Sequence, residues 1–574
     1  MITKVLSYII LAIFSTFVLP IYGQDASIYE WQTNALSPSE KRWSEFSSSV
    51  DARITSSLRQ HPVYHAMKND ETDSMKTKRD SSLPSTFYPH DKQNIVLTSY
   101  GKGKTDGDFI PYEGKSNENW RLFGHGCHNF GKHGTLYGTI QYARGTHKEI
   151  SWSAMRFPEL YWPYTLTDST GGDSKYEYYG IEGGYGVNLG KVYFGVIAQF
   201  DGELAYRMTD PRLKNNTTFL QLGFDAGFSS PKGQRLMADA KYLRNKEHES
   251  DSYWRPGEQQ RFFTLYGFGL YDNKRSSVSM GRSRMYYVNG LKSHFSYASP
   301  TDKTVCTTIN IGLNINKMDA EESDFTSPYG SRTTTLTPQI EFKWKINENN
   351  TISLFSDNHL EKRLGYERVF EKYITNTATS SYDYRQIAEN QYYTLLTRQG
   401  LNALRYSVSL GKHHILGIQY GIGYFYRSEK NSFYDFSVAN KNMINIPRFD
   451  YKLSTKKHEL SAGFNWGHQK VKHHEYNVDI KTSSIQHLDF QTCFAPYAYY
   501  ASEYDIFAAD LTYIYYFKKL GIGMRLKYMN ISGNRLDDVE YTKEIGFNSI
   551  CPMISPQSDI HNEQWINGSI FVLF

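Results

Sequence analysis

The stretch LGIGMRLKY, residues 520–528, alternates apolar side chains with small or basic ones. In an extended chain successive side chains point to opposite faces, so every second residue lies on the same face. One face carries Leu520, Ile522, Met524, Leu526 and Tyr528, and the other carries Gly521, Gly523, Arg525 and Lys527. The pattern therefore predicts a β-strand with one apolar face.

The same alternation recurs through most of the chain, as in HILGIQYGIGYFYR (414–427), LTPQIEFKWKI (336–346) and VCTTINIGLNI (305–315). A soluble sandwich would also alternate, but its strands average roughly 5 to 6 residues. These runs are about 10 to 14 residues long, and a tilted strand needs about 9 to 11 to cross the hydrocarbon layer of a membrane. We therefore expect an all-β fold, a transmembrane antiparallel up-and-down β-barrel.

The connections between these strands fall into two length classes, which is typical of such barrels. Short turns are expected at 130–135, 188–191, 229–234, 272–277, 346–350, 411–413 and 518–521. Long polar connections are expected at 147–175, 317–334, 362–392, 428–442 and 534–561. Closure with both chain ends on the periplasmic side requires an even number of strands, which we predict to be about 18 to 22.

The first 92 residues differ from the rest. Lys4 is followed by an apolar run and then by Gly23, which predicts that residues 1–23 are a signal peptide; an uncleaved anchor helix is the alternative. Residues 24–92 are polar, with a possible short helix at 39–60, and could be a lumen insert, a periplasmic tether or a flexible leader. Residues 93–574 form the predicted barrel, exported to the outer membrane of a bacterial cell.

Composition excludes some functions and leaves others open. The 64 basic and 59 acidic residues nearly cancel, so binding to nucleic acid gains no support. Aromatic residues make up 16% of the chain, which suits strands and a surface between lipid and water. The four cysteines show no C-x-x-C spacing, and their pairing is left open. On a strand His125 and Cys127 would share a face while His128 points away, so we predict no metal site and no cofactor.

Four segments carry a family resemblance: 134–152, 157–173, 178–195 and 205–215, which includes AYRMTDPRLKN. In these segments the chain resembles a family of uncharacterised outer-membrane β-barrel proteins from Bacteroidota, a domain-of-unknown-function family. The resemblance implies the location and the architecture of the chain, and it implies no substrate.

Charged and polar side chains on the lumen face of the predicted strands are candidates for solute selectivity. This set comprises Glu341, Lys343, Lys345, Gln419, Arg427, Arg525 and Lys527. If the lumen is open, their mixed charges would select among solutes, as rings of charged side chains do in other pores.

Two further segments offer loop contacts for a ligand. Trp152, Tyr161 and Trp162 lie in the connection 147–175, which either caps the pore and binds a ligand or folds into the lumen with its aromatic residues packed together. Arg207, Asp210 and Arg212 could bind a carboxylate, a phosphate or lipopolysaccharide, or they could simply form a solvated Asp-Pro turn.

We therefore expect a non-enzymatic outer-membrane barrel, a pore or an auxiliary transport component for an unidentified solute. A loop-plugged barrel that binds other envelope proteins is the alternative, and an outer-membrane lipid hydrolase is a third. The expected partners are outer-membrane lipid, lipopolysaccharide and the barrel-assembly machinery. The chain ends on INGSIFVLF (566–574), which we interpret as the closing strand, with Phe574 as the assembly signal.

Overall fold

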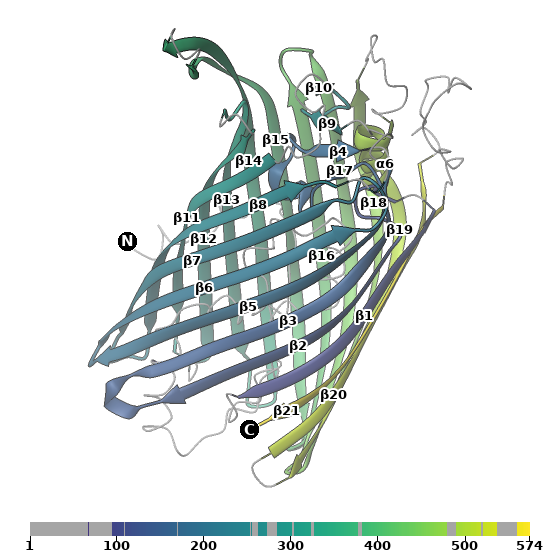
Figure 1. The fold of residues 1–574 in the computed structure, drawn as a ribbon. Coiled ribbons are helices and arrows are strands. Elements are labelled where there is room, and N and C mark those ends of the chain that lie inside the picture. Colours follow the sequence, from purple (N-terminus) through teal and green to yellow (C-terminus); the bar gives the residue numbers. More distant parts are fainter. Residues whose placement is uncertain are drawn as a thin grey trace, which may run out of the picture.

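The structure, a computed structural model, is a closed antiparallel β-barrel of eighteen strands (Figure 1). It describes residues 67, 94–107, 109–168, 170–252, 254, 262–272, 284–300, 303–322, 326–376, 381–478, 490–517, 520–536 and 560–574. The predicted signal peptide and the predicted helix at 39–60 lie outside these residues. No helix of the described chain is both long and apolar enough to span a membrane.

Each barrel strand pairs antiparallel with its neighbours along the chain, and β21 closes the ring by pairing with both β20 and β1. The strands are β1 (Ile95–Gly107), β2 (Ser116–Asn129), β3 (Thr135–Ile150), β5 (Gly172–Leu189), β6 (Val192–Arg207), β7 (Lys214–Ser229), β8 (Arg235–Ser250), β11 (Arg284–Ala298), β12 (Val305–Glu321), β13 (Tyr329–Lys345), β14 (Asn350–Asn376), β15 (Ser381–Leu410), β16 (His414–Asn431), β17 (Phe436–Ser454), β18 (His458–Asn477), β19 (Ser502–Phe517), β20 (Leu520–Arg535) and β21 (Ile560–Leu573). The predicted fold class and even strand number are confirmed.

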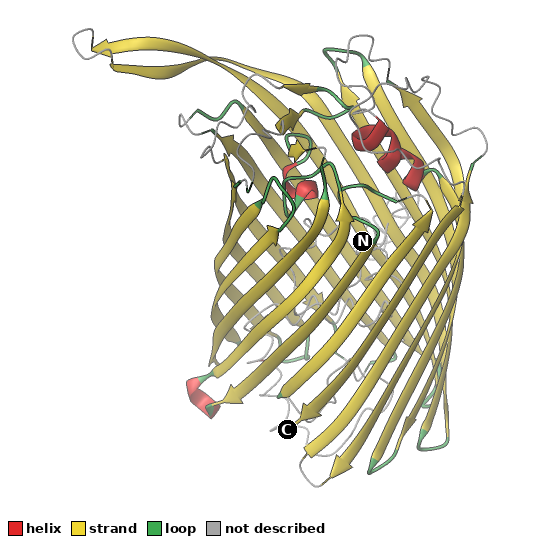
Figure 2. Cartoon of the chain, turned by 45° about the vertical axis from the view of Figure 1, so that its right-hand side comes forward, coloured by secondary structure: helices red, strands yellow, loops and turns green. Residues whose placement is uncertain are grey.

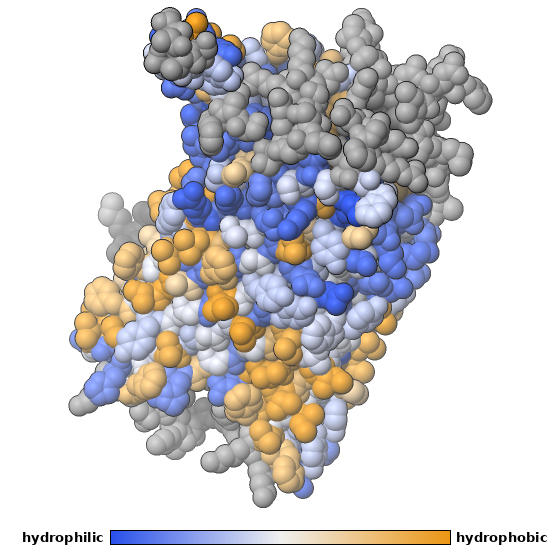
Figure 3. Space-filling model, in the orientation of Figure 1, coloured by the Kyte–Doolittle hydropathy of each residue, from blue (hydrophilic) through white to orange (hydrophobic). Residues whose placement is uncertain are grey.

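The two faces predicted by the alternation in the sequence are the outer and inner faces of the barrel wall. On β20 the apolar series is exposed on the outer surface, with Ile522 at 53% and Met524 at 56%, whereas Lys527 on the other face is buried. Apolar side chains gather in a band over the part of the wall nearer the short turns, and hydrophilic ones lie toward the other end (Figure 3). Unpaired backbone groups are costly in lipid, and the closed barrel has no unpaired sheet edge. The wall can therefore lie in a membrane with lipid covering this band.

The two length classes of connection lie at opposite ends of the barrel, which we call the turn end and the loop end. Both β1 and β21 have their terminal residues at the turn end, where Ile95 pairs with Leu573. The turns predicted at 130–135, 188–191, 229–234, 346–350 and 411–413 all lie at this end. β19 ends and β20 begins there too, and residues 518–519 of the turn predicted at 518–521 lie outside the described residues. One of these turns holds the short 3-10 helix η2 (Gly131–His133). The first residue of β1 and the last residue of β21 thus lie at the same end of the barrel, as an even strand number requires.

Other boundaries were wrong. The turn predicted at 272–277 does not join two barrel strands, because Asp272 lies in the long connection between β8, which ends at Ser250, and β11, which begins at Arg284. Residues 273–277 lie outside the described residues. Most of the connections expected at 317–334, 362–392 and 428–442 are strand. Polar residues suggested loops there, but β14 and β15 continue beyond the rim as a two-stranded ribbon (Figure 2). Most side chains of this ribbon are exposed, whichever face of the strand they lie on.

Three connections fold together at the loop end. Residues 151–171 contain helix α5 (Pro158–Tyr161) and strand β4 (Leu166–Asp168), which pairs with β9 (Phe262–Leu265) and, through it, with β10 (Tyr271–Asp272). The connection from β18 to β19 adds the π-helix η3 (Phe490–Phe494) and helix α6 (Ala495–Tyr500). We call residues 151–171, 262–272 and 490–501 the cap.

Candidate functional site

The cap is built around aromatic side chains that are buried among the barrel strands. In the connection 151–171, Tyr161 and Tyr164 are fully buried, and Trp152 and Trp162 nearly so. Tyr161 packs on Tyr286 of β11 at 4.7 Å between ring centroids. The connection therefore lies inside the barrel mouth, the second of the two arrangements that its sequence allowed.

The tip of this connection reaches the opposite wall. Arg363 on β14 donates hydrogen bonds to the backbone carbonyl oxygens of Glu159, at 2.8 Å, and Trp162, at 2.9 Å. The connection begins at β3. Around the ring of eighteen strands, β14 is the eighth strand after β3 and β16 is the tenth. A chain segment that leaves one wall is thus held by the wall facing it.

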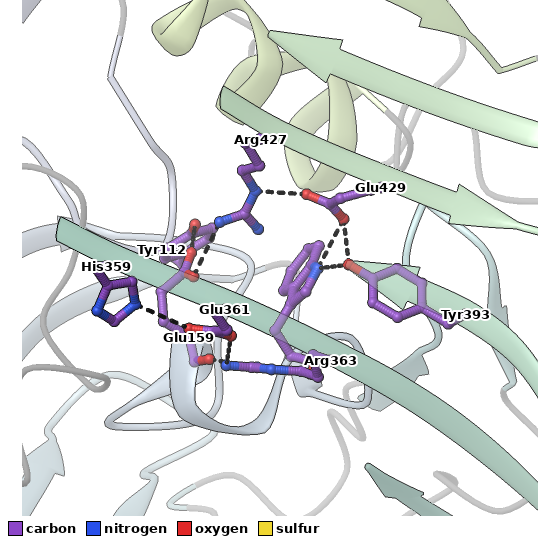
Figure 4. Close-up of polar contacts among 9 residues, drawn as sticks. Tyr112, Glu159, His359, Glu361, Arg363, Tyr393, Arg427 and Glu429 are labelled. Carbon is purple, nitrogen blue, oxygen red and sulfur yellow. Dashed lines mark hydrogen bonds and ion pairs between the residues drawn. The ribbon is translucent and has the colours of Figure 1, made fainter. Parts of the chain in front are cut away.

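A second arginine, on β16, holds the same tip (Figure 4). Arg427 pairs with the Glu159 carboxylate at 3.4 Å and with Glu429 at 2.8 Å. Glu429 also accepts hydrogen bonds from the indole N–H of Trp162, at 2.9 Å, and from the Tyr393 hydroxyl, at 2.5 Å. We call Glu159, Trp162, Arg363, Tyr393, Arg427 and Glu429 the latch.

The two legs of the connection are fixed to the near wall. Arg156 pairs with Glu203 of β6, and its guanidinium lies over the Tyr176 ring of β5 at 4.5 Å. Farther along, Asp168 pairs with Arg207 at the end of β6 at 2.9 Å, and both side chains are buried. Removing one partner of a buried pair leaves an uncompensated charge, at a cost of about 3 to 5 kcal/mol. The connection is therefore fastened along its length.

A tyrosine from the connection between β1 and β2 completes the contacts of Glu159. The Tyr112 hydroxyl donates to the Glu159 carboxylate at 2.5 Å. Burial, together with the nearby Glu159 charge, raises the pKa of Tyr112 well above its usual range. Tyr112 thus keeps its proton and its role as a donor at any physiological pH. Burial likewise raises the pKa of Tyr161, whose hydroxyl donates to Asn245.

The predicted lumen residues separate into groups along the barrel. Arg427 belongs to the latch, whereas Lys527 lies directly across from Asp510 of β19, with Arg525 two residues nearer the turn end. Glu341 and Lys343 pair with each other at 3.2 Å near the turn end of β13, where Lys345 ends the strand. Gln419 is buried on the inner face of β16. These candidates do not form a single ring.

The loop candidates separate as well. Arg207 anchors the cap through Asp168, so it is no solvated turn residue. Asp210 and Arg212 pair with each other at 3.2 Å, and the Arg212 guanidinium lies 4.9 Å from the centre of the Trp254 ring. These two residues therefore form the local turn that the sequence allowed.

An ion-pair network lies on the inner wall, nearer the turn end than the latch. Arg448 of β17 pairs with Asp450 at 2.7 Å and with Asp510 at 2.8 Å, and Arg405 of β15 pairs with Asp450 at 3.3 Å. A Cβ on Gly463 would lie 2.1 Å from an Arg448 nitrogen, so only glycine lets the guanidinium approach the β18 backbone this closely. The wall is shaped to hold these charges.

Three latch residues, Arg363, Tyr393 and Glu429, were not among the candidates from the sequence, and neither was Tyr112, which contacts the latch through Glu159. The alternation that placed Arg427 on the inner face also places Glu429 there, two residues on. The same spacing relates Arg363 to Glu361, which pair at 2.8 Å. A search for opposite charges at every second residue would have found both pairs.

No curated protein is similar in sequence to this chain. Several solved structures resemble it over most of their length. They include the ferric yersiniabactin uptake receptor FyuA from Yersinia pestis (9% identity, 83% of this chain and 80% of that one, TM-score 0.38), the FrpB iron transporter from Neisseria meningitidis, F3-3 variant (10% identity, 83% and 82%, TM-score 0.37), and the copper transporter OprC (9% identity, 84% and 80%, TM-score 0.35).

The chain also matches a family of proteins. Residues 85–549 fit the sequence pattern of a family of unknown function (DUF6850). The match covers most of the barrel strands and the whole of the cap described above. The chain therefore belongs to this family, and its structure is an outer-membrane-type β-barrel.

Proposed function

We propose that the protein takes up a solute across the outer membrane and that the cap is the gate of its pore. The observation that supports this most is that the tip of the cap, at Glu159 and Trp162, is held by Arg363 and Arg427 on the opposite wall. A connection attached to one wall only would leave the mouth open. A cap fastened on both sides closes it until the latch contacts break.

The latch combines polar contacts with apolar packing, because Trp162 also lies in a buried cluster with Leu395 of β15 and Phe436 of β17. Release of the tip would expose this apolar surface to water, so the closed state is the stable one without a ligand. Arginine and glutamate side chains can exchange their partners for water or for a charged or hydrogen-bonding solute. Ligand binding that is stronger in the open state would shift the equilibrium toward that state.

Liposome swelling tests the gate. Replacing residues 153–167 with a short Gly-Ser linker should raise the rate at which small sugars enter liposomes that contain the barrel. Arg363→Met should raise it as well, and it provides a second variant in case the replacement does not fold. Heat-modifiable migration on a gel identifies folded barrels. Equal entry rates for the wild type and for both folded variants would contradict a gating role.

We also propose a second role, the binding of another envelope protein at the ribbon of β14 and β15. Its part beyond the rim exposes Ile374 (65%), Ile387 (56%) and Tyr382 (53%). A photoreactive amino acid at position 387 should crosslink to one discrete partner in intact cells. Crosslinks to lipopolysaccharide alone would contradict this role.

Outer-membrane lipid would cover the apolar band on the outer wall of the barrel. For the barrel as a whole we propose transport rather than catalysis.

A further inference from the structure

A cavity of about 60 Å³ lies between the inserted connection and the loop ends of β1, β2 and β3. Its lining includes Tyr112, His147, Arg156, Glu159 and Trp565. About 10 to 15 Å³ of such volume is enough for one water molecule, so the cavity can admit several waters or part of a small solute. It lies beside the latch, because Glu159 belongs to both.

Four of the five charged side chains in the cavity wall have counter-charges, and the fifth is Glu113. Arg156 pairs with Glu203, and Arg207 pairs with Asp168. Both carboxylates lie outside the lining. Lys115 pairs with Glu149, also outside it, at 2.9 Å. The lining carboxylate of Glu159 is matched by Arg427. An ionic solute that contacts one of these four side chains would have to disrupt its pair and leave the partner without a counter-charge.

Uncharged polar groups make up much of the remaining lining. His147 is 7% exposed, and its Nε2 has no hydrogen-bond partner among the described residues. The ring bonds to the backbone of Glu113, which leaves the Nε2 lone pair available to a hydroxyl or amide donor. Thr105, Ser116, Asn117, Ser153, Ser174 and Asn215 also line the cavity.

The aromatic side of the cavity has a fixed position. Gly103 has no side chain, and a Cβ there would lie 2.7 Å from the ring of Trp565. The indole therefore packs flat on the β1 backbone, and it is 9% exposed. Binding sites for small molecules typically combine such an apolar surface with a few polar groups of defined position.

We propose that this cavity binds an uncharged, hydroxyl-rich small solute, with His147 Nε2 accepting a hydrogen bond from a solute hydroxyl and Trp565 packing against the C–H face. The role of this binding in uptake rests on the gate proposed above. The binding itself does not, because the cavity exists with the latch closed.

Saturation-transfer NMR on the folded, full-length barrel in detergent tests the site, with glucose, glucuronate and glucosamine as probes at neutral pH. The three share a pyranose ring and differ in charge. We expect transfer to glucose, and signals at least about fivefold weaker for the two ions. Equal or stronger signals from either ion, or no transfer to any probe, would overturn the proposal.

Three variants locate the binding. His147→Phe fills the cavity and should abolish the glucose signal, whereas His147→Gln keeps an acceptor and should retain part of it. Trp254→Ala, which changes an exposed indole outside the lining, should leave the signal unchanged. An unchanged signal in folded His147→Phe would refute the site. Binding without faster swelling in Arg363→Met would refute the gate alone, and faster swelling without binding would refute the site alone.

Discussion

The guanidinium of Arg363 on β14 donates a 2.8 Å hydrogen bond to the backbone carbonyl of Glu159, a residue whose segment begins on the opposite wall of the barrel. A bond to the backbone does not depend on the side chain at the tip. It fixes the path of the chain, whereas the bonds of Arg427 and Trp162 to Glu429 fix individual side chains. The latch therefore has a backbone part and a side-chain part, which substitutions can separate.

The side-chain part should show energetic coupling. Arg427→Met leaves Glu429 and Glu159 without their cation, so it should lower the free energy of unfolding by about 3 to 5 kcal/mol. Glu159→Gln should cost less, because Arg427 keeps Glu429. Urea unfolding of both single variants and the double variant in lipid vesicles should give a coupling energy of about 1 to 3 kcal/mol. Strictly additive losses would show that the 3.4 Å contact contributes nothing.

Glycine at position 463 should be required for the lumen ion pairs. Gly463→Ala places a Cβ within 2.5 Å of Asp510 and closer still to Arg448. We expect a loss of about 1 to 3 kcal/mol in the free energy of unfolding, the usual cost of overpacking. Gly568→Ala on β21 is the control, because its Cβ would meet nothing within 4 Å. Equal stability of the two variants would contradict the packing.

How much the sequence could predict depends on the range of the interactions involved. Alternation over 520–528 identified the strand, its outer face and the inward direction of Arg525, because these follow from the backbone alone. It could not show that the tip of the connection beginning at Ser151 contacts β14 and β16. That contact joins residues about 200 positions apart through closure of the ring. The ribbon of β14 and β15 was missed because polar residues on both faces remove the apolar signal of a strand.

The lumen charges Arg525 and Lys527 should set the ion preference of an opened pore. Substituting both by Glu in an Arg363→Met background reverses the charge beside Asp510 and should shift the reversal potential toward cation preference. The measurement is a bilayer recording under a salt gradient. If the preference does not change, these two side chains do not line the path.

The terminal residue should matter for assembly more than for stability. Phe574 donates its backbone N–H to Asn94 at 3.1 Å, and its side chain is exposed at the seam. Deleting Phe574 should lower the amount of heat-modifiable barrel in the outer membrane, whereas Phe574→Tyr should restore it. Wild-type amounts of folded protein without Phe574 would show that the residue is no assembly signal.

Single-channel recording of the Arg363→Met/Arg427→Met variant beside the wild type tests the gate most directly. Arg398→Met, on the outer face of β15, serves as the matched control. We predict a wild type that stays closed with rare openings, a control like the wild type, and a double variant with long, large openings. A wild type that conducts continuously, or a folded double variant with unchanged conductance, would contradict a cap that gates the barrel.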